Sequence, residues 1–522
     1  MAIYWCKNCQ VPLLKHNCCI CGSEGEYCSS DARFIFEPEK NLLESKLLIR
    51  LPECILYNTR RVIYKGKTFI WFTVKEGKIS LRIDKRYEFK EDNGEHLDSF
   101  IERAVRANYL YINELVVEAQ NFILKILNKF SGIVKNVTVA FSGGKDSIVV
   151  ADLVAKTMKE GFILFFADTG LELPDTYDFI DEVRKFMKVE LRTAKPDIDF
   201  IEMCQKLEPP SKIMRWCCTL LKANAANKLV NTFGAPILNF DGIRAVESHA
   251  RAEYPRVYDN RKIQGQVTAR PILHWPTLAV WLYIFREKLP FNKAYKNGFS
   301  RVGCGICPYN STYDDVILRE FYVNSNTGDK NSKYWALWKE KWDAFEKIIY
   351  DFAKTHSKCD GKRFFEEGYW KKRKPNRTYN KTVIRKYKKD LFSYTFLNGI
   401  PTSLPEFLKP ITNIRMYSTS NWFRSCKQNP GIIAGSIGGK ELLIIGDFDL
   451  TLVEQQILRA INCVGCGACT YLCPVEAIKI EKGKIKINQE RCVRCGKCIK
   501  IKNCVALSYK SKRNIIVNIE TI

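Results

Sequence analysis

The chain has 522 residues, 46% of them hydrophobic and 27% charged, so we expect about three or four globular domains and not a single core. The start, "MAIYWCKNCQ", lacks the pattern of a secretory signal, and no apolar run approaches the roughly 20 residues of a membrane span, which predicts a cytoplasmic protein without membrane contact. The net charge of +26 favours polyanionic partners such as nucleic acid, or anionic substrates, although a lysine-rich proteome would explain it equally well.

Cysteines are concentrated towards the two ends of the chain. Of the 22 cysteines, six lie in residues 1–28 and eight in residues 463–504, mostly as Cys-x-x-Cys pairs. In a reducing compartment such groups are metal or cluster ligands more often than disulfides. Near the start, two such pairs stand eight residues apart, a spacing typical of a zinc ribbon. We therefore expect residues 1–30 to hold a structural zinc, although two spare cysteines leave the ligand set open; the expected ligands are Cys6, Cys9, Cys18 and Cys21.

Residues 31–130 are expected to form a small β-rich module and a connecting helix. Short runs that favour strands, "KLLIRL", "RRVIY", "FIWFTV" and "KISLRI", are separated by polar turns. Residues 97–130 have apolar residues at helical spacing and no proline, which predicts one or two helices.

Residues 131–330 alternate between strand-like and helix-like stretches. "NVTVAF" precedes a helix that starts near Asp146, "FILFFAD" precedes one that starts near Pro174, and "PILNFDGI" follows another. This alternation predicts an α/β domain with a parallel sheet and flanking helices. Ligands of such sheets bind at the carboxyl ends of the strands, where the glycine-rich turns of this segment fall.

The turn after "NVTVAF" has the composition of a phosphate cradle. It reads Ser142-Gly143-Gly144-Lys145-Asp146-Ser147, without the Walker A spacing. The glycines allow backbone N–H groups to approach an anion, the serines add hydroxyl donors, and the following helix adds its positive end. Lys145 adds a full charge that would stabilise charge developing on phosphates.

This hexapeptide resembles the PP-loop of the ATP pyrophosphatase superfamily, and further segments resemble the phosphoadenylyl-sulfate (PAPS) reductase family within it. These segments are "FFADTGLELPDTYDFIDEV", "DGIRAVESHAR" and "RPILHWPTLAVWLYI", and the resemblance covers about residues 135–310. It implies a site for an adenine nucleotide: ATP, adenylyl sulfate or PAPS. The binding residues that it implies are Ser142, Gly143, Gly144, Lys145, Asp146, Ser147, Asp168, Thr169, Gly170, Gly242, Arg244 and Arg251. Catalytic roles are expected for Lys145, Asp146 and Arg244.

Two cysteine pairs in the same domain suggest a further cluster. Cys217-Cys218 and Cys304-x-x-Cys307 are separated by 85 residues. The pattern resembles the [4Fe-4S] site of assimilatory adenylyl-sulfate reductases and of related iron–sulfur PP-loop sulfur-transfer enzymes. Thiolates are the usual ligands of such clusters, so we expect a [4Fe-4S] cluster here, with zinc or unligated thiols as alternatives.

Residues 331–455 are expected to be a basic and aromatic, helical and mixed region. "YWALWKEKWDAFEKIIYDFAKTH" has aromatic residues at helical spacing, which indicates a packed helix face. The tract 371–389 has ten lysines or arginines and no acid, and is interpreted as a solvated segment or as a contact for a phosphate backbone.

Residues 456–522 are predicted to form a ferredoxin domain with two [4Fe-4S] clusters. The first cysteine run has the bacterial ferredoxin spacing with a following proline, and the second repeats it with a longer last spacing. In such domains the fourth cysteine of each run ligates the other cluster. The expected ligands are Cys463, Cys466, Cys469 and Cys504 for one cluster, and Cys492, Cys495, Cys498 and Cys473 for the other.

Two reactions fit these motifs. In the first, the protein performs reductive sulfur chemistry on PAPS or adenylyl sulfate, with electrons from a redox partner protein passing through the fused ferredoxin. In the second, it uses ATP to adenylate an acceptor such as tRNA for thiolation. Two observations count against the reductive reaction: the family's Glu-Cys-Gly-Leu-His motif is absent, and residues 142–147 have the sequence of the ATP-binding form of the loop. Three expected clusters in one chain favour the reductive reaction. A third alternative is an electron-carrying scaffold with a regulatory nucleotide site.

Overall fold

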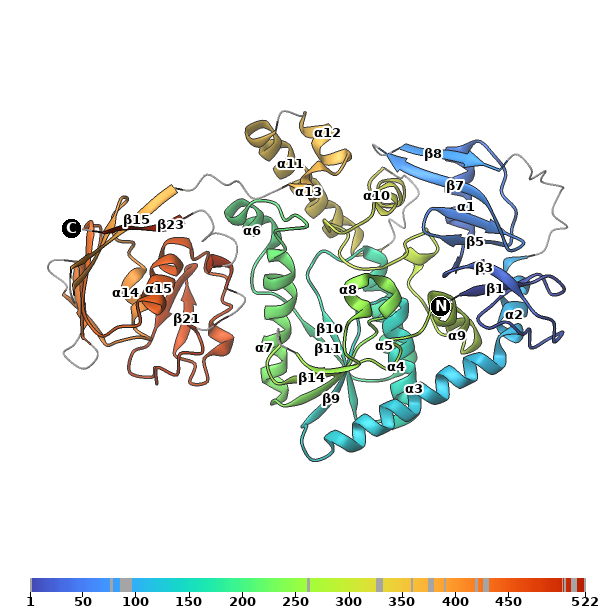
Figure 1. Ribbon diagram of the computed structural model, residues 1–522, viewed down its shortest axis with the longest axis horizontal. Coiled ribbons are helices and arrows are strands. Elements are labelled where there is room, and N and C mark those ends of the chain that lie inside the picture. Colours follow the sequence, from blue (N-terminus) through green and yellow to red (C-terminus); the bar gives the residue numbers. More distant parts are fainter. Residues whose placement is uncertain are drawn as a thin grey trace. The chain divides into compact units, whose positions relative to one another are not determined.

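The computed structural model separates into two compact units, each described by itself below (Figure 1). The first comprises Met1–Lys195 and Leu229–Trp370, and the second Pro196–Lys228 and Lys371–Ile522. The described residues are 2–75, 78–84, 96–260, 263–324, 332–357, 360–373, 380–388, 391–417, 421–425, 431–499, 501, 504–507 and 514–520. Within them, no helix combines the length and apolar character that crossing a bilayer requires.

The first unit begins with two antiparallel sheets. The first sheet has the order β2-β1-β3 and the second the order β4-β5-β6-β7-β8. Their strands are β1 (Ile3–Cys6), β2 (Val11–Leu13), β3 (Glu26–Ser29), β4 (Arg33–Phe34), β5 (Ile55–Asn58), β6 (Arg61–Tyr64), β7 (Lys67–Lys75) and β8 (Lys78–Ile83). The expected β-rich module is therefore present, and three of its four predicted runs are strands.

The fourth run, "KLLIRL", was wrongly expected to be a strand. Helix α1 (Glu37–Leu47) occupies its first part and ends at Leu48, which has left-handed backbone angles. This helix is fixed by packing that local sequence does not reveal. Its Glu39 accepts a hydrogen bond from the buried Arg33 (Nη1 to Oε2, 2.6 Å) and its Leu43 is fully buried.

Two helices, α2 (Leu97–Ala107) and α3 (Tyr109–Phe130), connect this module to the central sheet, as the spacing predicted. The central sheet has six strands in the order β11-β10-β9-β12-β14-β13, all parallel except β13. They are β9 (Asn136–Ala140), β10 (Phe162–Ala167), β11 (Leu191–Ala194), β12 (Ile237–Phe240), β13 (Val257–Asp259) and β14 (Gln266–Ala269).

Helix α4 packs on strands β9 and β10 of this sheet, and α3 and α9 pack against α4. The parallel α/β class is thus confirmed, and α4 and α5 start where the sequence predicted. The remaining helices of this part are α4 (Lys145–Met158), α5 (Pro174–Met187), α8 (His249–Ala252), α9 (Thr277–Arg286), α10 (Thr312–Leu318), α11 (Trp335–His356) and α12 (Gly361–Glu366). Helix α11 buries Trp338, Trp342 and Phe345, as its aromatic spacing indicated.

The second unit combines a seven-stranded sheet with the cysteine-rich C-terminal segment. The sheet order is β17-β18-β19-β20-β16-β15-β23, and β21 and β22 form a separate hairpin. Its strands are β15 (Asn380–Lys388), β16 (Leu391–Phe396), β17 (Ile414–Tyr417), β18 (Trp422–Ser425), β19 (Gly431–Ser436), β20 (Glu441–Gly446), β21 (Ile478–Glu481), β22 (Lys484–Ile487) and β23 (Asn514–Glu520). Its helices include α6 (Phe200–Leu207), α14 (Leu404–Leu408) and α15 (Leu450–Asn462). The boundaries between the two units along the chain fall within α7 (Asn224–Phe233) and α13 (Tyr369–Lys372).

One buried core joins the sheet to the C-terminal segment. It includes Tyr394 and Ile444 of the sheet, Ile457 of α15, and Cys469 and Cys498. Of the basic tract 371–389, residues 380–388 form β15, and residues 374–379 and 389 lie outside the described part of the chain.

Candidate functional site

The strand order places the expected nucleotide-binding segments at one edge of the six-stranded sheet. The chain passes from the central β9 to β10 on one side, and later to β12 on the other. Parallel sheets bind ligands at the carboxyl ends of strands where the order reverses in this way. Segment 142–147 follows β9, segment 168–170 follows β10, and segment 242–251 follows β12. The structure therefore brings the three segments to the same edge.

The loop between β9 and α4 is a tight backbone turn. Gly143 has φ +71°, and a Cβ atom there would lie 2.6 Å from Cγ2 of Thr176. Both the backbone angle and the close contact require glycine. The Ser147 hydroxyl donates to the Gly144 carbonyl (2.8 Å), and the Ser142 N–H donates to the Ser147 oxygen (3.3 Å). These bonds fix the loop in front of the positive end of α4.

Two side chains that the sequence did not single out hold the loop from outside. Asn292 Nδ2 donates to the Gly143 carbonyl at 3.2 Å and to Thr176 Oγ1 at 3.1 Å. The Tyr295 hydroxyl accepts a hydrogen bond from the Lys145 backbone N–H at 2.9 Å. Both residues are buried and lie about 150 positions from the loop in sequence, a separation that local patterns do not bridge.

Three charged side chains form a buried group behind the loop. Lys145 Nζ lies 2.9 Å from Asp146 Oδ2, and Arg244 Nε lies 2.6 Å from Asp146 Oδ1. Burial opposes ionisation of Asp146, but the charges of Arg244 and Lys145 outweigh it and lower its pKa to about 2. Burial lowers the pKa of Lys145, and the Asp146 charge works against that change. The carboxylate thus holds two cations, at the positions where an anionic ligand is expected.

Gly242, in the segment after β12, allows the backbone to approach this charged group closely. A Cβ atom at Gly242 would lie 2.9 Å from the Asp146 carbonyl carbon and oxygen. Any side chain there would have to displace the Asp146 backbone. The glycine in "DGIR" therefore has a packing reason, beside the nucleotide contact that the resemblance implied.

The loop after β10 joins the nucleotide edge to a cysteine. Asp168 Oδ1 accepts hydrogen bonds from the Gly170 N–H (2.8 Å) and from the Tyr177 hydroxyl (2.7 Å). Thr169 Oγ1 donates to Glu172 Oε1 (2.8 Å) and lies 3.3 Å from the sulfur of Cys304. The Gly305 N–H donates to the Leu171 carbonyl at 2.7 Å, which fixes the cysteine loop to this segment.

Helix α11 contacts both the loop after β10 and the loop that carries Cys304. Lys341 Nζ donates to the Gly170 carbonyl at 2.9 Å. Trp338 packs on the cysteine loop, where a Cβ atom at Gly305 would lie 2.9 Å from the indole nitrogen. Neither residue was identified from the sequence, where this helix showed only a packed aromatic face.

The rim of the site carries the segment after β12. Glu247 accepts hydrogen bonds from the Arg244 N–H (3.0 Å) and from the Arg251 side chain, and Arg301 lies 3.5 Å from it. Arg251 and Arg301 are 23% and 63% exposed, so they are available to an incoming anion, in contrast to the buried Arg244.

The middle-domain cysteines divide between the two units. Cys304 and Cys307 belong to the first unit, and Cys217 and Cys218 belong to the second. A hydrogen bond from Cys217 and the nearby Arg215 lower the pKa of Cys218 to about 5 against the effect of burial. The ligation of one cluster by all four stays a prediction.

The C-terminal cysteines lie in two groups, and their ligation of two clusters stays a prediction. One hollow is lined by Cys463, Cys466, Cys469 and Cys504. In the other group, the thiol of Cys498 interacts electrostatically with those of Cys492, Cys473 and Cys495. Burial raises the pKa of Cys466 and Cys469 to about 12 and that of Cys498 to about 11. Such thiols favour the neutral form until a metal or cluster binds them.

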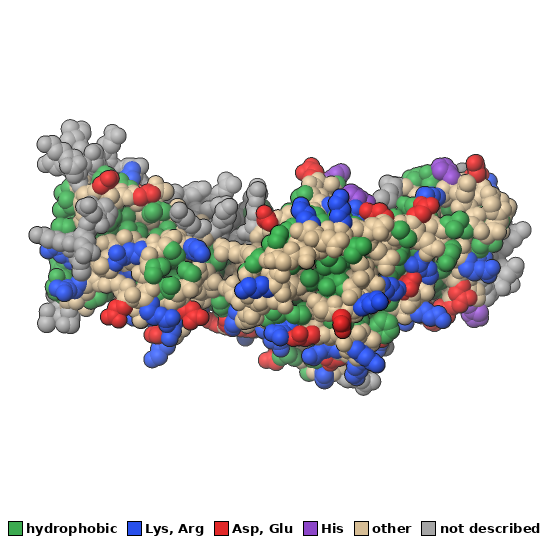
Figure 2. Space-filling model, turned by 90° about the horizontal axis from the view of Figure 1, so that it is seen from below, with side chains coloured by type: hydrophobic (Ala, Val, Ile, Leu, Met, Phe, Trp, Pro, Cys, Tyr) green, Lys and Arg blue, Asp and Glu red, His purple; other side chains and the backbone are tan. Residues whose placement is uncertain are grey.

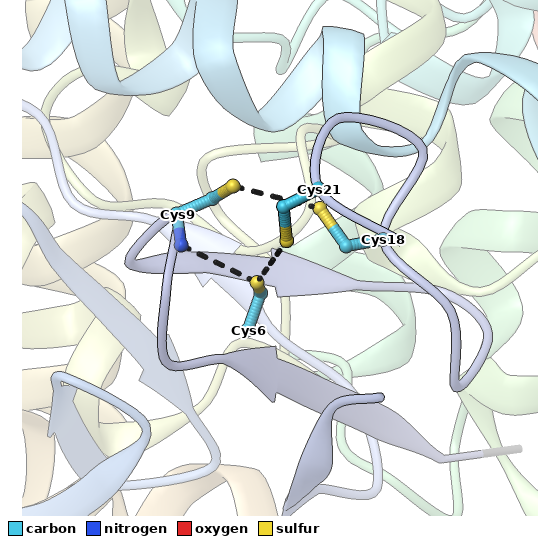
Figure 3. Close-up of side chains that lie close together, drawn as sticks. All are labelled: Cys6, Cys9, Cys18 and Cys21. Atoms are coloured by element: carbon cyan, nitrogen blue, oxygen red, sulfur yellow. Dashed lines mark hydrogen bonds between the residues drawn. The ribbon is translucent and has the colours of Figure 1, made fainter. Parts of the chain in front are cut away.

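Figure 3 shows the N-terminal thiols converging, Cys6 from the end of β1, Cys9 from the turn after it, and Cys18 and Cys21 from a later loop. The ligand atoms of Cys6, Cys9, Cys18 and Cys21 all lie within 4.8 Å of one another, the separation that one tetrahedral ion requires. Hydrogen bonds from Ser23 lower the pKa of Cys21 to about 6, while burial raises that of Cys6. The group fits zinc by geometry and donor chemistry.

Two stretches of the sequence match known domain families. Residues 136–310 match the phosphoadenosine phosphosulfate reductase domain, and residues 456–504 match the 4Fe-4S dicluster domain. The chain contains a PAPS reductase domain fused to a dicluster ferredoxin domain. The first match spans β9 to the Cys307 loop, and the second spans the end of α15 and the eight C-terminal cysteines.

Curated relatives of the chain include an uncharacterized protein and proteins named as adenosine 5'-phosphosulfate reductases. An uncharacterized protein of Methanocaldococcus jannaschii is 33% identical over 279 residues, 53% of this chain and 53% of that protein. The adenosine 5'-phosphosulfate reductase of Oceanobacillus iheyensis is 29% identical over 177 residues, 33% of this chain and 71% of that enzyme. The chain spans about half the length of the first curated relatives that it matches.

Among solved structures, the chain is similar to the PAPS reductase of Candida auris. The sequences are 20% identical, the TM-score is 0.30, and the match covers 42% of this chain and 97% of the other.

Proposed function

We propose that this protein binds an adenylyl nucleotide at the edge of its six-stranded sheet and performs reductive sulfur chemistry there, in the manner of PAPS or adenylyl-sulfate reductases. The observation that carries the proposal is the contact between Thr169 and Cys304 at 3.3 Å. It joins the expected adenosine-binding segment to an expected cluster ligand. A redox centre beside the nucleotide is what a reductase of this kind needs, and a simple nucleotide carrier has no use for one.

The proposed reaction takes two electrons. Adenylyl sulfate and two electrons yield AMP and sulfite, because the sulfur–oxygen bond to the nucleotide breaks and sulfur is reduced. The dicluster domain would supply these electrons, received from a redox partner protein. Lys145 and Arg244 would hold the phosphate charge, with Asp146 positioning both cations.

The cofactors of the proposal are two [4Fe-4S] clusters in the dicluster domain, a third on the four middle-domain cysteines, and a structural zinc on the N-terminal thiols. Thiolate donor sets suit each of them. A reducing, cytoplasmic location goes with this proposal, since exposed clusters and free thiols persist there.

A second candidate is an ATP-dependent sulfurtransferase that thiolates tRNA or another nucleic acid. Residues 142–147 have the sequence of the ATP-binding form of the loop, which favours this second candidate. The charge of +26 would suit a nucleic-acid partner. On the face drawn in Figure 2, however, the coloured lysine and arginine side chains are spread among acidic and hydrophobic ones.

Anaerobic binding of ATP, adenylyl sulfate and PAPS to the purified, iron-loaded chain separates the two candidates. We expect adenylyl sulfate or PAPS to bind and to release sulfite when titanium(III) citrate is the reductant, which avoids the sulfite that dithionite generates. Tight ATP binding with no binding of either sulfonucleotide would contradict the reductase. Lys145→Met should abolish nucleotide binding and leave the iron content unchanged. Cys304→Ser should lower the iron content and leave nucleotide binding nearly unchanged.

A further inference from the structure

A buried arginine of helix α15 lies within the cysteine-rich core of the second unit. Arg459 is 3% exposed. Its Nη1 donates to the Gln456 side-chain oxygen and to the Cys498 carbonyl, both at 2.9 Å. Its guanidinium carbon lies 5.1 Å from the ring centre of Phe407. These hydrogen bonds go to neutral acceptors, and among the described residues no carboxylate forms an ion pair with this guanidinium.

The same side chain is shared by both groups of cysteines. It lines the hollow surrounded by Cys463, Cys466, Cys469 and Cys504. It also binds the backbone of Cys498, which belongs to the other group. Arg459 thus lies against both groups of expected cluster ligands.

A buried charge without a counter-charge is costly, so such a residue is retained where something opposes it. Two clusters ligated by thiolates carry net negative charge, and reduction adds one more electron to each. A positive charge that both clusters share would favour that added electron. Charge and hydrogen bonding near a cluster are known determinants of its potential.

We propose that Arg459 is the shared counter-charge of the two clusters and raises the reduction potential of both. The inference rests on the dicluster domain alone and stands whichever nucleotide reaction the first unit performs. Arg459 belongs to α15, which ends just before the first cysteine of the domain. The helix that leads into the domain therefore also sets the electrostatic surroundings of its clusters.

The test is a potentiometric titration of the iron-loaded full chain, followed by electron paramagnetic resonance. In Arg459→Gln, the ratio of reduced to oxidised cluster at a fixed potential should fall about tenfold, which is about 59 mV for a one-electron couple. Both clusters should shift in the same direction. Unchanged potentials, or a shift of only one cluster, would overturn the proposal.

A second variant keeps the arginine in place and neutralises it. Gln456→Glu is isosteric and sets a carboxylate against the guanidinium, so it should lower both potentials as Arg459→Gln does. If Arg459→Gln fails to take up iron, this variant decides the question, and wild-type potentials in it would refute the shared role.

Two controls separate charge from packing. Arg459→Lys keeps the charge and should retain potentials near those of the wild type; a full shift in this variant would show that charge is not the cause. Arg385→Gln removes an arginine of the same unit that already pairs with Glu454 at 2.8 Å, and should leave both potentials unchanged. None of these measurements of cluster potential depends on sulfite release.

Discussion

The nucleotide edge of the first unit and the cysteine-lined core of the second both bury positive charge, but they balance it in different ways. At the nucleotide edge, Asp146 pairs with Lys145 and Arg244 within the protein itself. In the cysteine core, Arg459 bonds to neutral acceptors and faces thiols whose pKa values burial raises. The first site is therefore formed before its ligand arrives, whereas the second requires its cofactors to complete its charge balance.

Removal of iron should affect the cysteine core much more strongly than the nucleotide edge. Chelation would take away the negative charge that opposes Arg459, and an unpaired buried charge costs about 3–5 kcal/mol. We expect limited proteolysis, read by mass spectrometry, to show new cleavage in residues 450–499 while residues 136–195 stay protected. Equal loss of protection in both regions would show that the two do not differ in their dependence on cofactor.

The preformed loop should be sensitive to a single methyl group. Gly143→Ala combines a left-handed backbone with a contact of 2.6 Å to Thr176, so we expect a loss of about 3 kcal/mol in unfolding free energy and loss of nucleotide binding. Gly132→Ala is the matched control, because Gly132 has φ +73° and no neighbour within 4 Å of the added carbon. It should cost about 1–2 kcal/mol and leave nucleotide binding unchanged. Equal costs measured by denaturant unfolding would mean that the Thr176 contact has no effect.

The internal charge balance predicts a pH dependence. The folded-state pKa of Asp146 is lowered from 3.8 to about 2, so its contribution is present above pH 3.8 and is lost as the pH falls towards 2. Asp146→Asn should therefore be less stable than the wild type by about 2 kcal/mol at pH 7. The difference in unfolding free energy between Asp146→Asn and the wild type should become smaller as the pH falls below 3.8. Asp343→Asn, which removes an exposed carboxylate paired with Lys339, controls for surface charge.

The smallest effect is expected at the surface of the second unit. Asp197 pairs with Lys228 at 2.6 Å and accepts a hydrogen bond from Tyr471, and it is 54% exposed. Because exposed pairs contribute little, Asp197→Asn should change the free energy of unfolding by less than about 1 kcal/mol. A larger loss in thermal unfolding would show that this contact, and not the cofactors alone, holds the segment carrying Cys217 and Cys218 to the second unit.

Local patterns in the sequence predicted the parts of both regions that contiguous residues determine. The β9–α4 loop and the two cysteine runs follow from short-range spacing. The supporting residues Asn292, Tyr295 and Lys341 do not, because their roles arise from contacts across more than a hundred positions. Arg459 was missed for a related reason. An arginine near the end of a helix is ordinarily solvated, and only the packing of α15 against the cysteine segment buries it.

Strand β23 ties the carboxyl end of the dicluster segment to the seven-stranded sheet. The chain leaves the seven-stranded sheet after β20, passes through both cysteine runs, and returns as β23 to pair in parallel with β15. The segment is therefore an insertion anchored at both of its ends, not a pendant module on a tether. A truncation made directly after the last cysteine would expose β15 as an unprotected edge, which invites strand-to-strand aggregation. Transplanting this electron carrier onto another protein therefore requires the sheet to move with it.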